Sequence, residues 1–319
     1  MSVYGENKDF RLVRCKDDAE WLKQRVEGVG GSDVAAVMGL SPWRTPIDVW
    51  LEKTGRKDTD GQPSAAMRFG SVFEPIACED YKQRNPSMTV RRVNAVCQSI
   101  TRPWAQASLD YEIQDHVSKT WGVLEIKTAR SAKDWADGIP LYYQTQVLHY
   151  LSVTKRLYAH VHVFFRDTCE YKTYLVRPDA EDLQAVVNAV DDFWNNYVKA
   201  DRMPTATGGD TATLANMYGD TGEYATPDDV AEFESLVTQY QTAASFEKAA
   251  KERKAEITAQ LQQMAGDAKG IESDSYRVTV IRSNRTRLDS KRLQAEQPDI
   301  YAQYSTTKTQ FGGIKIKEF

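Results

Sequence analysis

Residues 122–129 read GVLEIKTA, an apolar stretch of strand-like composition that carries one glutamate and one lysine. Because successive side chains of a strand point to opposite faces, Glu125 and Lys127 share one face and Leu124 and Ile126 share the other. The pattern Glu-x-Lys occurs four times in the chain, at Glu6, Glu125, Glu170 and Glu252. GVLEIKTA alone combines it with an apolar strand and an aspartate one strand earlier, which makes Glu125 and Lys127 candidates for a catalytic site.

Asp110 lies fifteen residues before Glu125, in a second strand-like segment, QASLDYEI. Two adjacent strands can bring these carboxylates together, and paired carboxylates form a hard oxygen site suited to Mg²⁺, with Mn²⁺ as the alternative ion. The neighbouring Lys127 can steady or deprotonate an attacking water. Metal, carboxylates and lysine are the groups that hydrolysis of a phosphodiester requires. The competing interpretation is a solvated Glu–Lys pair at a sheet edge.

A second candidate site precedes this one in the sequence GGSD, residues 30–33. These residues are expected to begin a helix over 34–38, with Ser32 or Asp33 as its N-cap. The start of a helix offers free N–H groups to an anion. Arg25 lies one or two turns upstream, and together with the Ser32 hydroxyl it can hold a terminal phosphate. The alternative is a capping serine beside a surface arginine.

The hydrophobic pattern around these motifs predicts an α/β chain. Helices are expected over 69–83, 142–153 and 180–199, and one that begins at Pro46 and ends before Gly55. Strands are expected over 93–100, 105–113 and 121–129, followed by a hairpin of 157–165 and 170–176.

The last third of the chain has a different character. Residues 201–228 are rich in Thr, Gly and Asp and are interpreted as a linker. A long helix is expected over 228–264, then a strand over 275–281, a helix over 290–296 and a last strand in the tail 312–319. The apolar residues of the long helix are expected to be mostly core: Phe233, Leu236, Val237, Tyr240, Ala244, Ile257, Leu261 and Met264.

Residues 276–292 hold six basic residues and one acid. Such a stretch can track a phosphate backbone. A solvated strand and loop is about as good an interpretation, and a protein-docking role is a third.

Composition limits the classes of protein. A chain of 319 residues corresponds to about two domains, and 41% hydrophobic with 27% charged residues is ordinary for a globular protein. The net charge of −4 disfavours a nonspecific basic coat for nucleic acid. Four scattered cysteines without a CxxC, and four histidines without ligand spacing, argue against zinc and disulfides and favour the cytosol. No segment is apolar enough for a secretory signal or a membrane span.

The motifs follow one another in a specific order. Arg25 precedes GGSDVAAVMGLSPWRTP (30–46), FGSVFEP (69–75), LD (109–110), LEIKT (124–128) and YYQTQVLHYLSVT (142–154). Over about residues 20–200, this order resembles the YqaJ-type viral recombinase family, the lambda-exonuclease-like group of the PD-(D/E)xK nuclease superfamily. The resemblance implies an α/β fold with a mixed central sheet flanked by helices. We expect this nuclease domain over 1–204, a linker over 205–228, and a helical arm with a small α+β tail over 229–319.

The resemblance also implies roles for single residues. It implies metal ligands at Asp110, Glu125, the Ile126 carbonyl and the helix residue Glu74. It implies that Lys127 is the catalytic lysine and that Gln146 and Tyr143 are the family's helix Gln and Tyr. It further implies that Arg25 and Ser32 grip the 5′-phosphate of DNA.

By the same resemblance, we expect a Mg²⁺-dependent 5′→3′ exonuclease that acts on double-stranded DNA ends. It would degrade the 5′-phosphorylated strand and leave 3′ single strands for a phage annealing protein, in the cytoplasm of a bacterial host and without a membrane. Family members can form a ring-shaped trimer around DNA. Two alternatives stay open: an endonuclease with the same Asp, Glu and Lys core, and a non-catalytic DNA-binding recombination scaffold.

Overall fold

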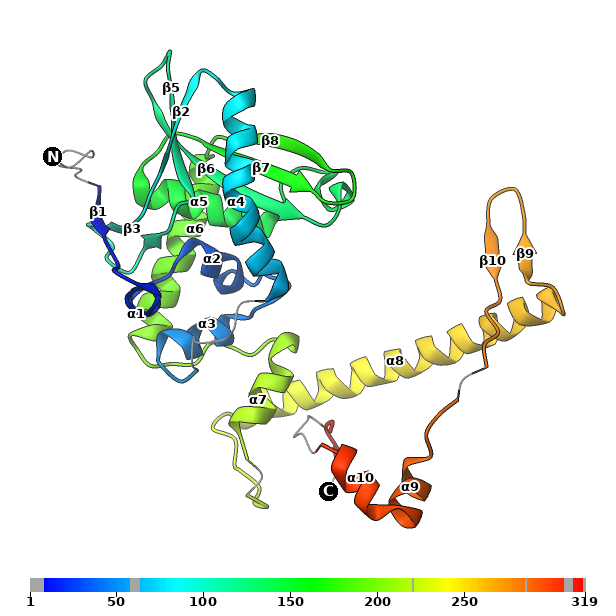
Figure 1. Cartoon of the computed structure of the whole chain (residues 1–319). Helices are drawn as coiled ribbons and strands as arrows, with labels where there is room; N and C mark the ends of the chain where they lie inside the picture. Colours follow the sequence, from blue (N-terminus) through cyan, green and yellow to red (C-terminus); the bar gives the residue numbers. More distant parts are fainter. Residues whose placement is uncertain (1–8, 58–63, 220, 285, 307–311, 318–319) are drawn as a thin grey trace. The chain divides into compact units, whose positions relative to one another are not determined.

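A computed structural model describes residues 9–57, 64–219, 221–284, 286–306 and 312–317 (Figure 1). The chain divides into two compact units, Met1–Thr213 and Leu214–Phe319. The residues singled out above for metal and catalysis belong to the first unit, as do Arg25 and Ser32, whereas the basic stretch 276–292 belongs to the second.

The centre of the first unit is a five-stranded sheet in the order β2-β5-β6-β7-β8. Its strands are Met88–Arg92 (β2), Tyr111–Asp115 (β5), Trp121–Ala129 (β6), Ala159–Phe165 (β7) and Glu170–Val176 (β8). The pair β6 and β7 is parallel and the other three pairs are antiparallel, so the sheet is mixed. A small antiparallel sheet beside it contains β1 (Phe10–Val13), β3 (Val96–Ser99) and β4 (Gln106–Ala107).

Helices cover both faces of the five-stranded sheet. On one face, Tyr81 of α4 (Ala65–Arg84) packs in a cluster with Leu124 and Ile126 of β6. On the other face lies α5 (Leu141–Thr154), which also packs against α2 (Gly31–Val37) and α6 (Ala180–Phe193). The remaining helical elements of this unit are α1 (Asp18–Val26), α3 (Pro46–Lys53), a 3₁₀ turn (Ala132–Trp135), a π-helical turn (Trp194–Val198) and a second 3₁₀ turn (Gly208–Asp210).

The side chains of β6 point alternately to the two faces of the sheet, so apolar residues lie on one face and Glu125 and Lys127 lie on the other. Leu124 is fully buried under α4, and burying one such side chain contributes about 1.5–3 kcal/mol. The intervening Glu125 and Lys127 point to the face of α5. The expected fold class, a mixed sheet flanked by helices, is confirmed.

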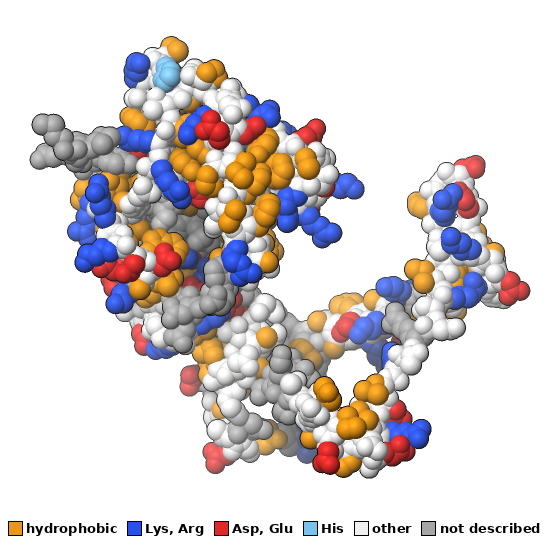
Figure 2. Space-filling model, viewed as in Figure 1, with side chains coloured by type: hydrophobic (Ala, Val, Ile, Leu, Met, Phe, Trp, Pro, Cys, Tyr) orange, Lys and Arg blue, Asp and Glu red, His pale blue; other side chains and the backbone are white. Residues whose placement is uncertain are grey.

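Part of α4 leaves apolar side chains in solvent. Phe69, Val72 and Ile76 are 41%, 74% and 55% exposed, and the view in Figure 2 shows hydrophobic side chains gathered where α4 crosses the sheet. The spacing of three and four residues puts these side chains on one side of the helix.

Several strand expectations were wrong in detail. The single strand expected over 105–113 is divided between β4 and β5, which belong to different sheets. The chain bends between them at Asp110, whose carboxylate accepts the backbone N–H of Ile126 in place of a ladder partner. Strand β2 was not expected, because its polar residues lack a clear alternation. The tail residues 312–317 form no strand, and 318–319 lie outside the described residues.

The second unit is dominated by the 36-residue helix α8 (Val230–Ala265). A short hairpin of β9 (Gly270–Glu272) and β10 (Arg277–Thr279) follows it, then α9 (Ser290–Glu296) and α10 (Pro298–Tyr304). Helix α7 (Thr211–Met217) spans the division between the units and, with the 3₁₀ turn before it, lies within the range 205–228 that we expected to be a linker.

The expectation that the apolar residues of α8 are mostly core was wrong. Phe233, Leu236 and Met264 are 52%, 58% and 73% exposed, and Tyr240 and Ile257 are exposed as well. The reason is that, within the described part of this unit, α8 packs mainly on β9 at its C-terminal end. None of the helices among the described residues is long and apolar enough to cross a membrane.

The basic stretch 276–292 is partly neutralised by acids nearby. Arg277 pairs with Glu272 at 2.6 Å and Arg292 pairs with Glu296 at 2.7 Å. Arg285 lies outside the described residues.

Candidate active site

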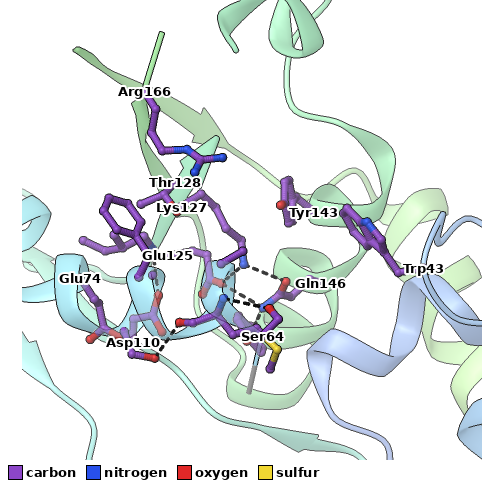
Figure 3. Close-up of a pocket in the computed structure, with 17 residues that line it drawn as sticks. Trp43, Ser64, Glu74, Asp110, Glu125, Lys127, Thr128, Tyr143, Gln146 and Arg166 are labelled. Carbon is purple, nitrogen blue, oxygen red and sulfur yellow. Dashed lines mark hydrogen bonds and ion pairs between the residues drawn. The ribbon is translucent and has the colours of Figure 1, made fainter. Parts of the chain in front are cut away.

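A cavity of about 750 Å³ opens where α4, β6 and α5 meet (Figure 3). Seven residues singled out from the sequence line it: Glu74, Asp110, Glu125, Ile126, Lys127, Tyr143 and Gln146. The structure therefore brings together side chains that are up to 72 positions apart in the chain (from Glu74 to Gln146).

The register of the sheet places the two acids of β5 and β6 side by side. Tyr111 pairs with Leu124 in this antiparallel pair, so Asp110, one residue earlier, lies across from Glu125. Asp110 Oδ2 accepts the backbone N–H of Ile126 at 2.9 Å. Because the N–H and C=O of one strand residue point to the same side, the Ile126 carbonyl also faces Asp110.

Glu125 is buried, and one of its two carboxylate oxygens has hydrogen-bond partners. Its Oε1 atom accepts from Lys127 Nζ at 2.6 Å and from Gln146 Nε2 at 2.9 Å. Its Oε2 atom is buried without a hydrogen-bond partner in the described part of the chain. A buried, unpaired oxygen of a charged group costs more than about 1–3 kcal/mol, so this atom is best explained by a ligand that the cavity admits.

Lys127 stands beside both carboxylates. Burial alone would lower the pKa of Lys127, but the charges of Glu125 and Asp110 outweigh burial and raise it. Its ammonium group donates to Gln146 Oε1 at 3.1 Å and lies 4.7 Å from the centre of the Tyr143 ring. Lys127 is therefore a fixed cation at the floor of the cavity.

The electrostatics of Asp110 fit a cation. Removal from water, and then the negative charge of Glu125, raise the pKa of Asp110 well above its usual range. A bound divalent ion would offset both effects, because it favours the ionised form of Asp110. Two adjacent carboxylates, one of them with a free buried oxygen, and a backbone carbonyl are the hard oxygen donors that Mg²⁺ and Mn²⁺ take.

Glu74 lies at the edge of this group. It lines the same cavity from α4, and its Oε1 atom is 3.3 Å from Arg92 Nη2. Among the described residues, no three His, Cys, Asp or Glu side chains close on one point as a metal cage. The residues present thus fit an ion held by two carboxylates, one carbonyl and water. Glu74 is a third acid that lines the same cavity.

Arg25 and Ser32 lie together, as expected, but outside the wall of the cavity. Arg25 Nη2 is 3.4 Å from Ser32 Oγ and 3.6 Å from Oδ1 of the buried Asp33. Asp33 also pairs with Lys53 at 2.7 Å and Arg44 at 2.9 Å. Burial by itself would raise the pKa of Asp33, but the three cations outweigh it and hold the pKa far below its usual range.

The first turn of α2 differs from the expectation. The helix begins at Gly31 and its N-cap is Gly30 rather than Ser32 or Asp33. The Asp33 side chain accepts the N–H of Gly30 at 3.1 Å. The Ser32 hydroxyl is therefore not used as a cap and stays available beside Arg25.

Tyr150 was missed by the sequence analysis. Its ring lies directly against Gly31, and its hydroxyl accepts from Gln146 Nε2 at 2.7 Å. It thus connects the start of α2 with the cavity. The signal was available, because Tyr143, Gln146 and Tyr150 follow one another at three and four residues and so share a helix face.

Residues 20–156 match the sequence model described as the YqaJ-like viral recombinase domain. This part of the chain is similar to the YqaJ-like viral recombinase domain. It contains all nine residues expected to hold the metal, to take part in catalysis or to grip the 5′-phosphate: Arg25, Ser32, Glu74, Asp110, Glu125, Ile126, Lys127, Tyr143 and Gln146.

The chain is also similar to a curated protein and to solved structures. The chain is 29% identical over 306 residues to the uncharacterized protein YqaJ of Bacillus subtilis strain 168, with 94% of each chain covered. It is similar to an alkaline exonuclease, LHK-Exo, from Laribacter hongkongensis, at 21% identity and a TM-score of 0.48, covering 57% of this chain and 93% of the other. A second structure, LHK-Exo in complex with dAMP, has 22% identity, the same coverage and a TM-score of 0.49.

Proposed function

We propose that this protein is a divalent-metal-dependent deoxyribonuclease that degrades double-stranded DNA from its ends in the 5′→3′ direction. It removes the 5′-phosphorylated strand and leaves a 3′ single strand. The proposal rests on the YqaJ-like domain and on the chemistry of the cavity.

The observation that carries the proposal is the arrangement of Asp110, Glu125 and Lys127. Two carboxylates lie side by side, and Lys127 Nζ stands 2.6 Å from Glu125 Oε1 while Glu125 Oε2 has no hydrogen-bond partner in the described chain. A bound Mg²⁺ or Mn²⁺ supplies Lewis-acid activation of the phosphodiester and of the attacking water. The residues that would hold the ion are Asp110, Glu125, the Ile126 carbonyl and, through water, Glu74.

Lys127 and Gln146 have separate roles in the proposed reaction. Lys127 has three N–H donors, of which Glu125 and Gln146 take two. The third can donate to the attacking water or to a phosphate oxygen, where a positive charge stabilises the charge that develops during cleavage. Gln146 donates to Glu125 and accepts from Lys127, so it fixes the orientation of both.

We propose that Arg25 and Ser32 set the direction in which the DNA strand is degraded. Their 3.4 Å contact leaves other guanidinium donors and the hydroxyl for a phosphate. Arginine binds phosphate through its planar fork of donors. A 5′-terminal phosphate held there would position the following nucleotides of the same strand in the cavity, which favours cleavage from that end.

A single assay tests this proposal. The substrate is a linear duplex with a 5′-phosphate on one strand, incubated beside a covalently closed circle, with Mg²⁺ or with EDTA. We expect Mg²⁺-dependent loss of the phosphorylated strand and an intact circle. Cleavage of the circle would instead favour an endonuclease. No cleavage of either substrate would favour a non-catalytic scaffold, or a protein that requires a partner.

The family resemblance supports further parts of the proposal. We propose that the protein acts in phage-type recombination in the cytoplasm of a bacterial host, and that a single-strand annealing protein takes up its product. We also propose a homotrimer that encircles DNA. Light scattering of the purified protein tests the trimer directly, because a monomeric mass would contradict it.

A further inference from the structure

Trp43 is a large apolar side chain that the fold leaves in solvent at the wall of the cavity. It is 65% exposed, yet it lines the same cavity as Asp110, Glu125 and Lys127 (Figure 3). Because Trp43 is so exposed, it contributes little of the stabilising free energy that burial of a tryptophan side chain would give the folded protein. Its position next to the catalytic group makes it a candidate for contact with the substrate.

The loop that carries Trp43 is held firmly. Ser41 Oγ accepts the backbone N–H groups of Trp43 and Arg44, each at 3.2 Å. The Arg44 guanidinium bonds to Asp33 at 2.9 Å and to Glu52 at 2.6 Å. The indole is therefore presented by a backbone that is already ordered, so little conformational entropy is lost when a ligand packs on it.

Two tyrosine rings lie close to the indole. Trp43 meets Tyr142 edge-on, with ring centres 4.8 Å apart and an angle of 78° between planes. Tyr143, whose ring lies 4.7 Å from Lys127 Nζ, is the next ring inward at 6.4 Å from Trp43. A row of aromatic rings thus leads from the catalytic lysine to the exposed indole.

We propose that Trp43 is a nucleobase-binding subsite, which stacks on a base of the DNA strand whose phosphodiester lies at Asp110, Glu125 and Lys127. The inference rests on the proposed function, because it needs a DNA strand in the cavity. A base is the fitting ligand, since a strand that places a phosphate among the carboxylates must place the attached bases against the walls. Stacking on an aromatic ring is sequence-tolerant, because every base has a π-face.

Binding without cleavage tests the subsite separately from catalysis. Duplexes carry 2-aminopurine at one of the first three positions of the 5′-phosphorylated strand, and EDTA prevents hydrolysis. We expect wild-type protein to quench the fluorescence at one of these positions. The quench is lost in Trp43→Ala and retained in part in Trp43→Phe. Leu157→Ala, which removes a similarly exposed (62%) apolar side chain away from the cavity, should leave the quench unchanged.

A double-mutant cycle then separates stacking from a merely structural role. On the intact duplex, Trp43→Ala should weaken binding about 5- to 150-fold. On a duplex that is abasic at the quenched position, wild-type protein should be weakened equally and Trp43→Ala should cause no further loss. Equal losses from Trp43→Ala on both duplexes, unchanged affinity, or an altered mass by light scattering would each overturn the subsite. A wild-type protein that quenches but does not cleave in Mg²⁺ would overturn the proposed function and support the subsite.

Discussion

Gly31 lies directly against the ring of Tyr150, so closely that a Cβ at position 31 would overlap the ring. Tyr150 in turn accepts a hydrogen bond from Gln146, which donates to Glu125 as well. One glycine at the start of α2 therefore sets the position of a chain of contacts that ends at a carboxylate of the cavity.

Gly31→Ala should impair both stability and cleavage. The new methyl group must displace the Tyr150 ring, and overpacking of this kind costs about 1–3 kcal/mol. Displacement of Tyr150 also disturbs Gln146, so we expect the rate of DNA cleavage to fall at least about tenfold. Gly30→Ala is the matched control, because a Cβ there meets its nearest atom, Asp33 Oδ2, at an ordinary 3.7 Å. Equal behaviour of the two variants in urea unfolding and nuclease assays would disprove the coupling.

Lys127→Ala should abolish most cleavage and leave DNA binding nearly intact. Loss of a positioned donor at the reacting phosphate lowers rates by about 10²- to 10⁴-fold. Single-turnover cleavage and fluorescence anisotropy in EDTA measure the two quantities separately. Lys172→Ala is the control, since Lys172 belongs to another Glu-x-Lys sequence on strand β8. Full activity of Lys127→Ala would remove this residue from the mechanism.

Asp110→Asn and Glu125→Gln should each weaken metal binding. Both changes remove a charged oxygen ligand while keeping the size of the side chain, and we expect the affinity for Mn²⁺ to fall at least about tenfold. Titration calorimetry measures this without any substrate. Glu170→Gln, which alters an exposed glutamate of β8, should bind Mn²⁺ as wild type does. If all three variants bind Mn²⁺ equally, the ion is held elsewhere.

Arg25→Ala and Ser32→Ala should reduce the preference for 5′-phosphorylated ends. A charge-assisted hydrogen bond contributes about 1.5–3 kcal/mol, so the ratio of cleavage rates on 5′-phosphate and 5′-hydroxyl duplexes should fall about 10-fold or more in Arg25→Ala. Arg56→Ala is the control, because Arg56 is an exposed arginine paired with Asp201. An unchanged ratio in both Arg25→Ala and Ser32→Ala would show that the phosphate is bound at another place.

His149 should make the folded state sensitive to acid. Burial lowers the pKa of His149 from 6.5 to about 4, because enclosure of the ring disfavours its charged form and outweighs the hydrogen bond to the carbonyl of Gln106 at 2.9 Å, which raises the pKa. The unfolded chain binds this proton near pH 6.5 and the folded chain does not, so stability is complete above pH 6.5 and falls as the pH drops toward 4. The full loss from this group is about 3 kcal/mol.

Urea unfolding between pH 7 and 4 measures that loss. Burial also lowers the pKa of His162 to about 4, so His149→Gln should reduce the slope of stability against pH without removing it. An identical slope in His149→Gln would show that this histidine titrates in the folded protein.

Local chemistry explains what could be predicted about the fold. The alternation of residues 122–129 correctly placed Glu125 and Lys127 on one face and Leu124 on the other, because successive side chains of a strand point to opposite faces. Pro46 at the first position of α3 and the capping box of Thr45 and Asp48 likewise follow from local rules. The order of motifs around these elements was enough to indicate the similarity to the YqaJ-like domain over residues 20–156.

Elements whose boundaries depend on distant partners could not be predicted in the same way. Residues 105–113 have the composition of one strand, but Ala107 pairs with Cys97 in one sheet and Tyr111 pairs with Leu124 in another. The apolar spacing of α8 indicated a buried face, whereas the described unit provides little to cover it. A pattern shows that a surface can be buried, and packing decides whether it is.

The sequence by itself determined which residue types are available for chemistry and the local face on which each lies. It placed Glu125 and Lys127 on one side of β6, and Tyr143 and Gln146 on one side of α5. The tertiary structure decided which of these faces meet, because the register of β5 on β6 and the packing of α5 across them involve contacts between distant parts of the chain. Those contacts put Asp110 across from Glu125, joined Gly31 to Tyr150, and left Trp43 exposed at the wall of the cavity.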